Sequence, residues 1–429
     1  MNVINDPFTW LAGQLVNWLS TFMPTNGVSI TMAVLRAASL GIFALVMFMV
    51  MTWIERKGVA RIQNRIGPNL AGPWGIFQPL ADGVKALTKE DITPDHADRI
   101  VYNIAPILSA VAAMIVFAAI PFGPGLIGAD INIGILYILA VSGLGVLAIL
   151  MAGWSSNNKY ALLGAFRVVA QLVSYEVPLV LSIVAPVMLA GSLSLVTIVE
   201  KQPVWFILVL PASAVIVMLS GMAEVGRSPF DLLDAESEII AGHHIEYSGM
   251  KFALFFLAEY IHAFAVSCVV TALFLGGWRG PNIAGVTVPW LWFFIKAILL
   301  FNIMVWARGT LPRLRIDQLM AFNWKFLVPL SLANLIVVPL ADRLAQGLGL
   351  AQGSWPWALM MLAFNVAMIL VAFALVGAAG RRVRVAAEAP AEVAAEAPTE
   401  SHDESGHGEE HGLARGADAG HAPATVGAH

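Results

Sequence analysis

Residues 204–275 read VWFILVLPASAVIVMLSGMAEVGRSPFDLLDAESEIIAGHHIEYSGMKFALFFLAEYIHAFAVSCVVTALFL. Both ends of this stretch, 204–223 and 252–275, are apolar and reach the length of about 20 residues that a membrane-spanning helix needs. The loop between them, 224–251, has two fixed positive charges, Arg227 and Lys251. Its carboxylates are Glu224, Asp231, Asp234, Glu236, Glu238 and Glu246. Acids beside hydrocarbon are costly unless they pair, meet water or take up a proton, so this acidic loop is a candidate functional region. A solvated loop whose acids face water is the alternative.

The spacing of three of these acids favours a functional role. If the segment after Pro229 is helical, Asp231, Asp234 and Glu238 share one helix face. Carboxylates so close together titrate as a coupled group, which suits proton uptake or relay.

The composition predicts an all-α integral membrane protein, a polytopic helical bundle with long cytoplasmic loops. Hydrophobic residues make up 59% of the 429 residues and charged residues 12%, and the mean hydropathy is +0.78. About nine transmembrane helices are expected, at 33–54, 104–122, 133–153, 177–199, 204–223, 252–275, 288–307, 326–343 and 356–379. The span at 326–343 is the weakest prediction, because Pro329 and Pro339 interrupt it. The single cysteine, Cys268, excludes an internal disulfide and a thiolate-ligated iron–sulfur cluster, so any redox cofactor must belong to a partner.

The distribution of lysine and arginine predicts the orientation. These residues concentrate in the loops that follow the first, third, fifth and seventh spans. By the positive-inside rule these loops are cytoplasmic, the N-terminus is outside and the C-terminal tail is cytoplasmic.

The chain divides into three segments. Residues 1–32 are predicted to be an interfacial segment, and residues 33–380 the transmembrane bundle. Residues 381–429 are predicted to be a disordered acidic tail, in which a metal site at His402, His407 and His411 is not expected. Within the first cytoplasmic loop, 55–103, Pro79 starts a predicted amphipathic helix whose apolar stripe could lie on the membrane surface beside a basic hairpin.

Nine sequence motifs follow one another along the chain. They are ERK at 55–57, QNRIGPN at 63–69, QPLADGVKALTKED at 78–91, NNKYALLGAFRVVAQLVSYEVP at 157–178, AEVGRSPFDL at 223–232, ESE at 236–238, EYSG at 246–249, ALFFLAEY at 253–260 and RGTLPRLRIDQLM at 308–320. In this order they resemble the quinone-site membrane subunit of respiratory complex I, the proton-pumping NADH:quinone oxidoreductase. The resemblance covers about residues 33–326.

The resemblance implies a subunit of a translocase in the bacterial plasma membrane, with no catalytic or metal site of its own. It implies quinone as the substrate, flavin and iron–sulfur clusters in partner subunits, and hydrophilic redox-arm subunits at the cytoplasmic loops, with other membrane-arm subunits and lipid as further partners. No nucleic-acid partner is expected. The quinone tunnel, formed by loops 55–103 and 224–251, would include Arg56, Lys57, Arg61, Arg65, Asp82 and Phe230. The carboxylates that couple quinone reduction to proton movement would be Glu176, Glu224, Asp231, Asp234, Glu236, Glu238, Glu246 and Glu259. The family usually has Glu where Asp234 stands.

Several alternatives remain open. A membrane-bound hydrogenase or ferredoxin-linked complex uses a homologous subunit, and a stand-alone proton or cation transporter would also carry intramembrane acids. Glu259 could be a static pair with His262 or Lys296, and Arg36 a static counter-ion.

Two apparent motifs are declined. Residues 123–128, GPGLIG, are predicted to be a turn rather than a nucleotide-binding loop, because no strand precedes them. His243 and His244 beside Glu246 are predicted to be a loop pair rather than a metal site.

Overall fold

The computed structural model describes residues 7–232, 242–281 and 288–395. In these ranges the regular elements are helices, apart from one isolated bridge between Gly123 and Leu126. Eight of the described helices are long and apolar enough to span a membrane. This confirms the predicted all-α, multi-pass membrane class. The described chain up to Val376 is one compact unit, and the described chain from Gly377 onward, the end of the last helix, belongs to a second.

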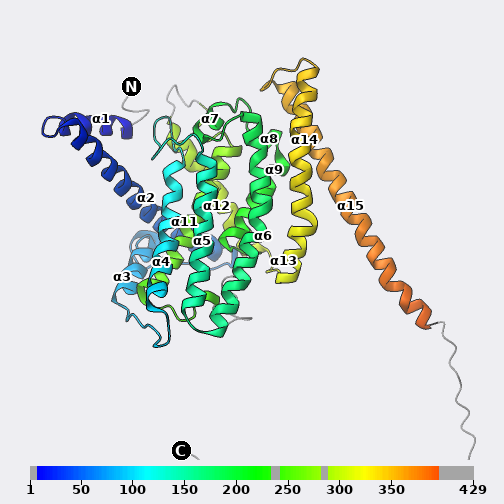
Figure 1. The fold of residues 1–429 in the computed structure, drawn as a ribbon, viewed down its shortest axis with the longest axis horizontal. Coiled ribbons are helices and arrows are strands. Elements are labelled where there is room, and N and C mark those ends of the chain that lie inside the picture. Colours follow the sequence, from blue (N-terminus) through cyan, green and yellow to red (C-terminus); the bar gives the residue numbers. More distant parts are fainter. Residues whose placement is uncertain (1–6, 233–241, 282–287, 396–429) are drawn as a thin grey trace, which may run out of the picture. The chain divides into compact units, whose positions relative to one another are not determined.

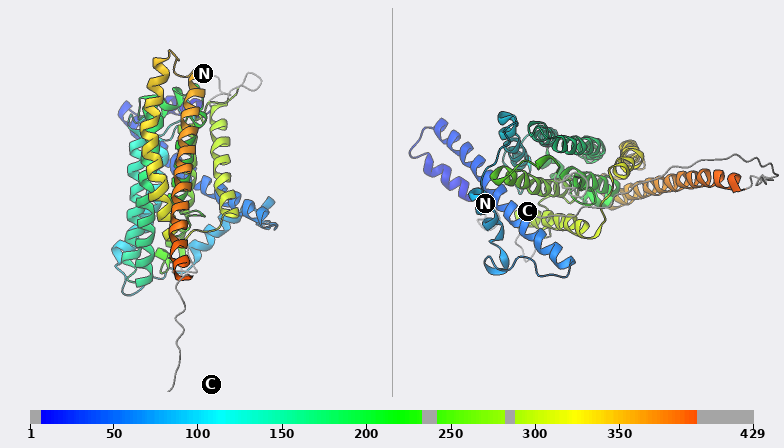
Figure 2. Two further views of the ribbon diagram at one scale, coloured as in Figure 1. Left: turned by 90° about the vertical axis from the view of Figure 1, so that its right-hand side faces the viewer. Right: turned by 90° about the horizontal axis from the view of Figure 1, so that it is seen from below.

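The first unit is a bundle of roughly parallel helices. It contains α2 (Thr25–Ile62), α4 (Arg99–Ile115), α5 (Gly134–Ser155), α6 (Lys159–Ala190), α9 (Pro211–Val225), α11 (Gly249–Phe274), α12 (Pro289–Thr310), α14 (Val328–Gly347) and the start of α15 (Trp355–Ala395). From α4 to α14 the helices run side by side in alternating directions, and α2 crosses them obliquely (Figures 1 and 2). The connections 63–98 and 311–315 and the described parts of the acidic loop, 226–232 and 242–248, therefore lie toward one end of the bundle, which we call the loop end.

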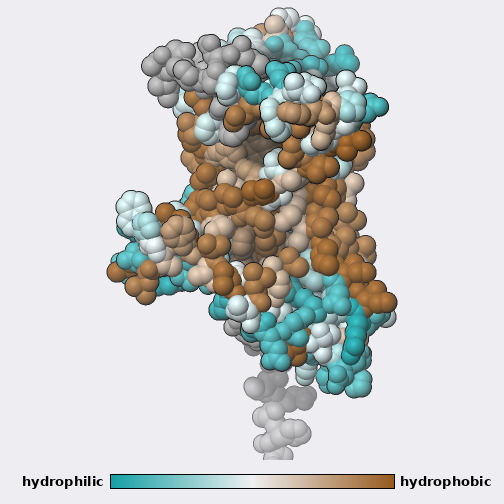
Figure 3. All heavy atoms as spheres, turned by 90° about the vertical axis from the view of Figure 1, so that its left-hand side faces the viewer, coloured by the Kyte–Doolittle hydropathy of each residue, from teal (hydrophilic) through white to brown (hydrophobic). Residues whose placement is uncertain are grey.

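The surface of the bundle matches a bilayer. α5 has 22 residues, which corresponds to about 33 Å at 1.5 Å per residue, close to the thickness of a hydrocarbon core. Figure 3 shows hydrophobic residues across the middle of one face and hydrophilic residues above and below them. Large exposed apolar side chains such as Ile42, Leu147 and Leu299 belong to these outer helix surfaces.

Shorter elements lie around the bundle. They are α1 (Pro7–Leu19), η1 (Pro73–Gly75), α3 (Gln78–Thr88), η2 (Val116–Ala119), α7 (Leu195–Glu200), α8 (Phe206–Val209), η3 (Gly242–His244), α13 (Ile316–Phe322) and the π-helical turn η4 (Asn323–Leu327). The helix predicted to start near Pro79 is confirmed as α3, and its Leu80, Val84 and Leu87 are exposed. The predicted turn at 123–128 is confirmed by a hydrogen bond from the Leu126 amide to the Gly123 carbonyl.

The prediction for 177–199 was wrong in its boundaries. α6 begins at Lys159, where the Asn158 side chain caps the helix by accepting a hydrogen bond from the Tyr160 amide. It ends before Gly191, which is left-handed and donates its amide to Val187. Polar residues in the first half of α6 made that half resemble a loop, although several of them point inward. The next helix, α7, is separate.

The predicted loop 55–103 also begins too early. α2 continues to Ile62, so the ERK motif lies on its last turns, because Glu, Arg and Lys are good helix formers. α2 begins at Thr25, within the segment 1–32 that was predicted to be interfacial, and α1 packs on it through Leu19, Val28 and Met32.

Prolines decide the shape of two other predicted spans. The span at 204–223 is split into α8 and α9, because Pro211 disfavours helical geometry at the residue before it, Leu210. The span at 326–343 forms as α14 in spite of its prolines, since Pro329 lies in the first turn. α13, η4 and α14 together make one continuous run, Ile316–Gly347. The predicted count of nine helices is not confirmed, because α9 alone has only 15 residues.

Candidate functional site

The first part of the acidic loop is held inside the bundle by α6. The buried Gln171 side chain donates hydrogen bonds of 2.8 Å to the carbonyls of both Ala223 and Phe230. The Phe230 ring is buried and packs against Tyr175, with 5.4 Å between ring centroids. One amide group thereby fixes the chain on both sides of the turn that follows α9.

The second part of the loop is fixed by α4 and the start of α6. The Glu246 carboxylate accepts a hydrogen bond of 2.7 Å from the Asn158 side chain, and its carbonyl accepts one from the Tyr102 hydroxyl. The rings of Tyr102 and Tyr247 are stacked with centroids 4.1 Å apart. Burial raises the pKa of Tyr247 to about 12, so this phenol stays neutral at physiological pH. Glu246 is therefore a fixed member of the loop.

A buried cluster of charges joins α2, α9, α11 and α12 at the loop end. Arg227, which follows α9, lies 2.7 Å from Glu55 and 3.3 Å from Glu259, and Arg308 also contacts Glu55. The Arg227 guanidinium lies 4.3 Å from the centre of the Tyr260 ring. Burial alone would lower the pKa of Arg227, but Glu259 and Glu55 raise it above its usual value. Arg227 therefore keeps its positive charge at physiological pH.

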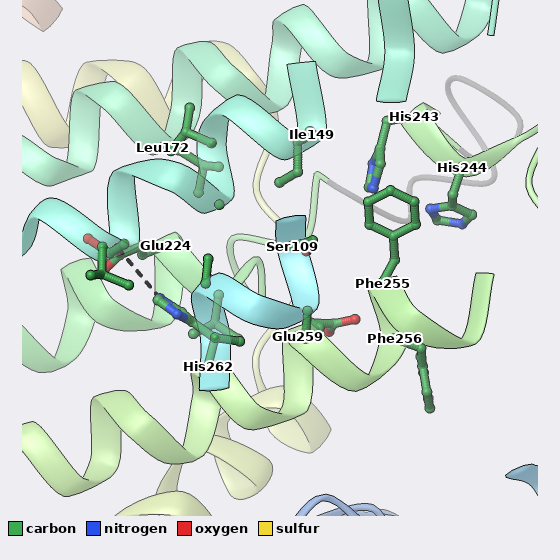
Figure 4. A pocket seen from close by; sticks show the side chains of 18 of the residues that line it. Ser109, Ile149, Leu172, Glu224, His243, His244, Phe255, Phe256, Glu259 and His262 are labelled. Carbon is green, nitrogen blue, oxygen red and sulfur yellow. Dashed lines mark ion pairs between the residues drawn. The ribbon is translucent and has the colours of Figure 1, made fainter. Parts of the chain in front are cut away.

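A cavity of about 250 Å³ lies next to this cluster, between α4, α5, α6, α9, η3 and α11. Its polar walls include Glu224, Glu259 and three histidines, His243, His244 and His262, and the other walls are mostly apolar (Figure 4). His262 Nε2 lies 3.5 Å from Glu224 Oε1. Glu259 therefore faces the charge cluster through Arg227 and the cavity through its position on α11.

His243 is the most deeply buried titratable group of this cavity. Its ring is 2% exposed and packs edge to face on Phe255, at 5.3 Å between centroids. Its Nδ1 is buried without a hydrogen-bond partner among the described residues. Burial, with a smaller effect of His244, lowers the pKa of His243 to about 3, so His243 is neutral at physiological pH.

Two further predicted carboxylates have defined interactions, one with a wall of the cavity and one within the loop. Glu176, on α6, interacts electrostatically with Glu224. Asp231 accepts a hydrogen bond of 3.4 Å from the Ser228 hydroxyl, directly after the segment that Gln171 holds. The structure therefore groups Glu176, Glu224 and Glu259 around one part of the bundle, and leaves Glu246 and Asp231 in the flanking loop.

The basic residues of the first loop line a second, open cavity of about 670 Å³ at the end of α2. Lys57, Arg61 and Arg65 contribute positive charge, and Trp53 and Trp74 contribute aromatic surface. The Trp53 indole donates to the Trp74 carbonyl at 3.1 Å, which joins α2 to the turn at η1. This combination suits an amphipathic molecule with an electron-rich polar group.

The other predicted tunnel residues are placed differently. Arg56 pairs with Asp82 of α3, and Gln78 also donates to Asp82, at 3.2 Å. Phe230 lies in the bundle core rather than on the wall of the basic cavity. The predicted residues Asp234, Glu236 and Glu238 fall outside the described residues.

The structure gives Glu259 a partner that the sequence did not suggest. Glu259 forms an ion pair with Arg227, while His262 pairs with Glu224. The Lys296 ammonium instead donates to the carbonyls of Leu275 and Gly277, at 2.7 and 3.0 Å. The prediction considered only His262 and Lys296 as partners of Glu259, whereas the segment after a neighbouring helix, α9, supplies Arg227.

Sequence reasoning missed several members of the site. Glu55, Arg308, Tyr260 and His262 were not named as site residues, and Arg227 was counted only as a loop charge. One signal was available: Glu55 and Arg308 each stand at the end of an apolar span and inside a recognisable motif. Their pairing could not be deduced, because it joins residues 172 and 253 positions apart.

Comparison with known proteins gives a consistent result. A family model described as NADH dehydrogenase matches residues 35–339. The NADH-quinone oxidoreductase H subunit of Dehalococcoides mccartyi (strain CBDB1) is 56% identical over 309 residues, which cover 72% of this chain and 86% of that protein. The corresponding H subunit 2 of Syntrophobacter fumaroxidans is 47% identical over 334 residues, 75% of this chain and 97% of that protein. The H subunit 2 of Geobacter sulfurreducens is 46% identical over 328 residues, 73% and 97% of the two chains.

Proposed function

Because the chain belongs to the NADH dehydrogenase family, with relatives named as H subunits of NADH-quinone oxidoreductase, we propose that it is the quinone-site membrane subunit of a proton-pumping respiratory complex in the bacterial plasma membrane. Quinone is the substrate, and the flavin and iron–sulfur clusters belong to partner subunits. The connections 63–98 and 226–248 face the cytoplasm and dock the hydrophilic redox arm, and the outer surfaces of the helices contact the remaining membrane-arm subunits. The segment before α2, which contains α1, is interfacial, and residues 381–429 form a cytoplasmic tail.

We assign quinone binding to the 670 Å³ cavity lined by Lys57, Arg61 and Arg65, which we call the basic cavity. Lys57, Arg61 and Arg65 surround a space bordered by Trp53 and Trp74, with Ile66 as a further apolar wall. Aromatic and aliphatic surface suits an isoprenoid tail, and cations stabilise the negative charge that a reduced quinone develops. Arg56 and Asp82 hold α3 against α2, and Phe230 keeps the neighbouring turn in place.

The observation that carries the proposal is the position of Arg227. It pairs with Glu55 on α2, the helix whose end lines the basic cavity. It also pairs with Glu259, which lines the 250 Å³ cavity. A change of charge at the quinone end therefore acts on Glu55 along α2, and Glu55 is linked to Glu259 by Arg227. Behind Glu259, the cavity continues to Glu224, which interacts with Glu176.

This geometry provides a physical link between quinone reduction and proton movement. Electron transfer from a partner's cluster makes quinone anionic, and the anion attracts protons and competes with the carboxylates for the same guanidinium groups. When Arg227 is drawn toward the new charge, Glu259 loses part of its counter-charge and takes up a proton from the cavity. Return to the starting state releases that proton into the chain of carboxylates, which also includes Asp231, Asp234, Glu236, Glu238 and Glu246.

The proposal is tested by neutralising single carboxylates in the native complex. We expect Glu259→Gln and Asp231→Asn to lower NADH:quinone turnover by about tenfold or more. NADH oxidation by an artificial acceptor, which draws electrons from the partner subunits, should be unchanged. Asp130→Asn is the matched control, because Asp130 is an exposed carboxylate between η2 and α5. Equal loss of both activities would contradict the proposed coupling role.

A further inference from the structure

His262 connects two groups of acids that are otherwise separate. It lies on α11, three residues after Glu259, so the two side chains project from neighbouring positions of one helix face. Both line the 250 Å³ cavity, while the imidazole is paired with Glu224 of α9 at 3.5 Å (Figure 4). A second cavity, of about 40 Å³, is also lined by this pair and lies between η2, α5, α6, α9 and α11.

The cavity has the volume and the groups to hold water. One water needs about 10–15 Å³ of such space, so 250 Å³ accommodates several. The buried Nδ1 of His243 points to the same conclusion, since a buried polar atom without a protein partner in the described chain is normally satisfied by water. The titratable groups on its walls are Glu224, Glu259, His243, His244 and His262, while α4, α5 and α6 contribute serines and apolar side chains.

We propose that His262 is a proton-carrying residue that transfers protons between Glu259 and Glu224 through the cavity. This inference rests on the proposed function and adds an imidazole to a path otherwise made of carboxylates. Neutral His262 takes a proton on one ring nitrogen from the Glu259 carboxyl through cavity water, and releases the proton on Nε2 to Oε1 of Glu224. Glu259 becomes a carboxylate, Glu224 becomes a carboxylic acid, and His262 is left as its other neutral tautomer.

The alternative is that His262 only positions Glu224. The two roles differ in what can replace the histidine. A positioning role needs a hydrogen-bond donor at Nε2, which an asparagine supplies in part. A carrier needs a group that takes up and releases a proton, which asparagine lacks and which free imidazole supplies.

The experiment uses the assembled complex in native membrane vesicles, with protons pumped per NADH oxidised as the readout. We expect His262→Ala and His262→Asn each to lower this ratio by about fivefold or more. Added imidazole should restore pumping in His262→Ala, where deletion of the ring leaves space, and should not restore it in His262→Asn. Val269→Ala is the matched control, because Val269 lines the second cavity with His262 but has no titratable group. It should pump normally and be insensitive to imidazole.

The outcomes separate the two proposals. Normal pumping in His262→Asn, or no response of assembled His262→Ala to imidazole, would overturn the proton-carrying role. If His262→Ala fails to assemble, the pumping ratio of His262→Asn decides alone. If Glu259→Gln also retains full quinone reduction and pumping, the proposed coupling function fails together with the role of His262. If Glu259→Gln loses these activities while His262→Asn pumps normally, only the role of His262 fails.

Discussion

At the scale of single residues, the stability of the site depends on Arg227. Its side chain is 4% exposed and is the shared partner of Glu55 and Glu259. Arg227→Met would leave two carboxylates at a buried position without this partner. Loss of one member of a buried charge cluster costs about 3–5 kcal/mol. We therefore expect a clear fall in the thermal unfolding temperature of the purified complex.

A partly exposed ion pair provides the comparison for the buried charge cluster of Arg227. Arg56 pairs with Asp82, and both side chains are about a third exposed to solvent. Arg56→Met should cost no more than about 1 kcal/mol of unfolding free energy, because such pairs are screened by water. Equal losses in the two variants would show that burial does not distinguish the clusters.

A second residue-scale prediction concerns the pH dependence of stability. The pKa of His243 is lowered to about 3 by burial, whereas the unfolded chain titrates near the ordinary value of 6.5. Between these values the unfolded state binds one proton more, so the stability that neutral His243 provides is present above pH 6.5 and is lost as the pH falls. At pH 5 the loss is about 2 kcal/mol.

This loss is measured as the fall in melting temperature between pH 7 and pH 5. His243→Asn, which does not titrate in this range, should show a smaller fall than the native protein. Parallel pH curves for the two proteins would contradict a buried neutral histidine. Cavity-lining Ser142→Ala controls for a change of polarity that does not alter any titratable group.

At the scale of helices and loops, η3 is held in place by close contact with α6. A Cβ added at Gly164 would lie 2.7 Å from the Cα of Gly242, which precedes His243. Gly164→Ala must therefore displace η3 and the histidines that line the cavity. We expect a loss of about 1–3 kcal/mol and a several-fold fall in NADH:quinone turnover.

The control for this contact is a glycine with free space. A Cβ at Gly143 of α5 meets no atom within 4 Å, so Gly143→Ala should leave turnover and stability unchanged or slightly improve the helix. Normal turnover in Gly164→Ala would mean that η3 can shift without disturbing the carboxylate path.

The same scale shows what the sequence could predict. Apolar runs identified most of the spanning helices, because a helix that faces lipid must be apolar over its full length. They failed for the first half of α6, where Gln171 is polar yet buried and donates to two loop carbonyls. Such a residue looks like part of a loop when only its polarity is considered. Its partners lie 52 and 59 residues away in the sequence.

The site was predictable to a similar extent. The motifs identified the carboxylates and the basic residues, and three of the basic residues do line one cavity. The pairs were not predictable, because Glu55, Arg227 and Arg308 come from three segments distant in sequence. Arg227 was likewise not among the partners predicted for Glu259.

At the scale of the whole molecule, the two ends of the bundle use charge differently. At the loop end, Arg227 and His262 contact carboxylates, whose charge changes when they take up a proton. At the opposite end, Lys296 donates to backbone carbonyls, and Arg279 donates to the carbonyls of Gln202 and Glu200. Carbonyls cannot take up protons at physiological pH, so these cations fix the connection between α11 and α12. Of these four side chains, Arg227 and His262 are therefore the ones whose partners can change charge.

The last prediction concerns the acidic C-terminal segment as a part of the whole chain. The family model matches residues 35–339, and the relatives align over 86–97% of their own lengths with about three quarters of this chain. The groups argued to bind quinone and move protons all precede residue 310. Deletion of residues 396–429 should therefore leave assembly and inhibitor-sensitive NADH:quinone turnover within about twofold of the native values, a change of less than about 0.5 kcal/mol in activation free energy.

The measurement is the turnover of purified truncated complex beside a full-length complex whose tail acids are replaced by glutamines. Normal turnover in both would confine the function to the bundle. Loss in the truncated complex alone would assign the segment a role that depends on its length, and loss in both would assign it a role that depends on its negative charge.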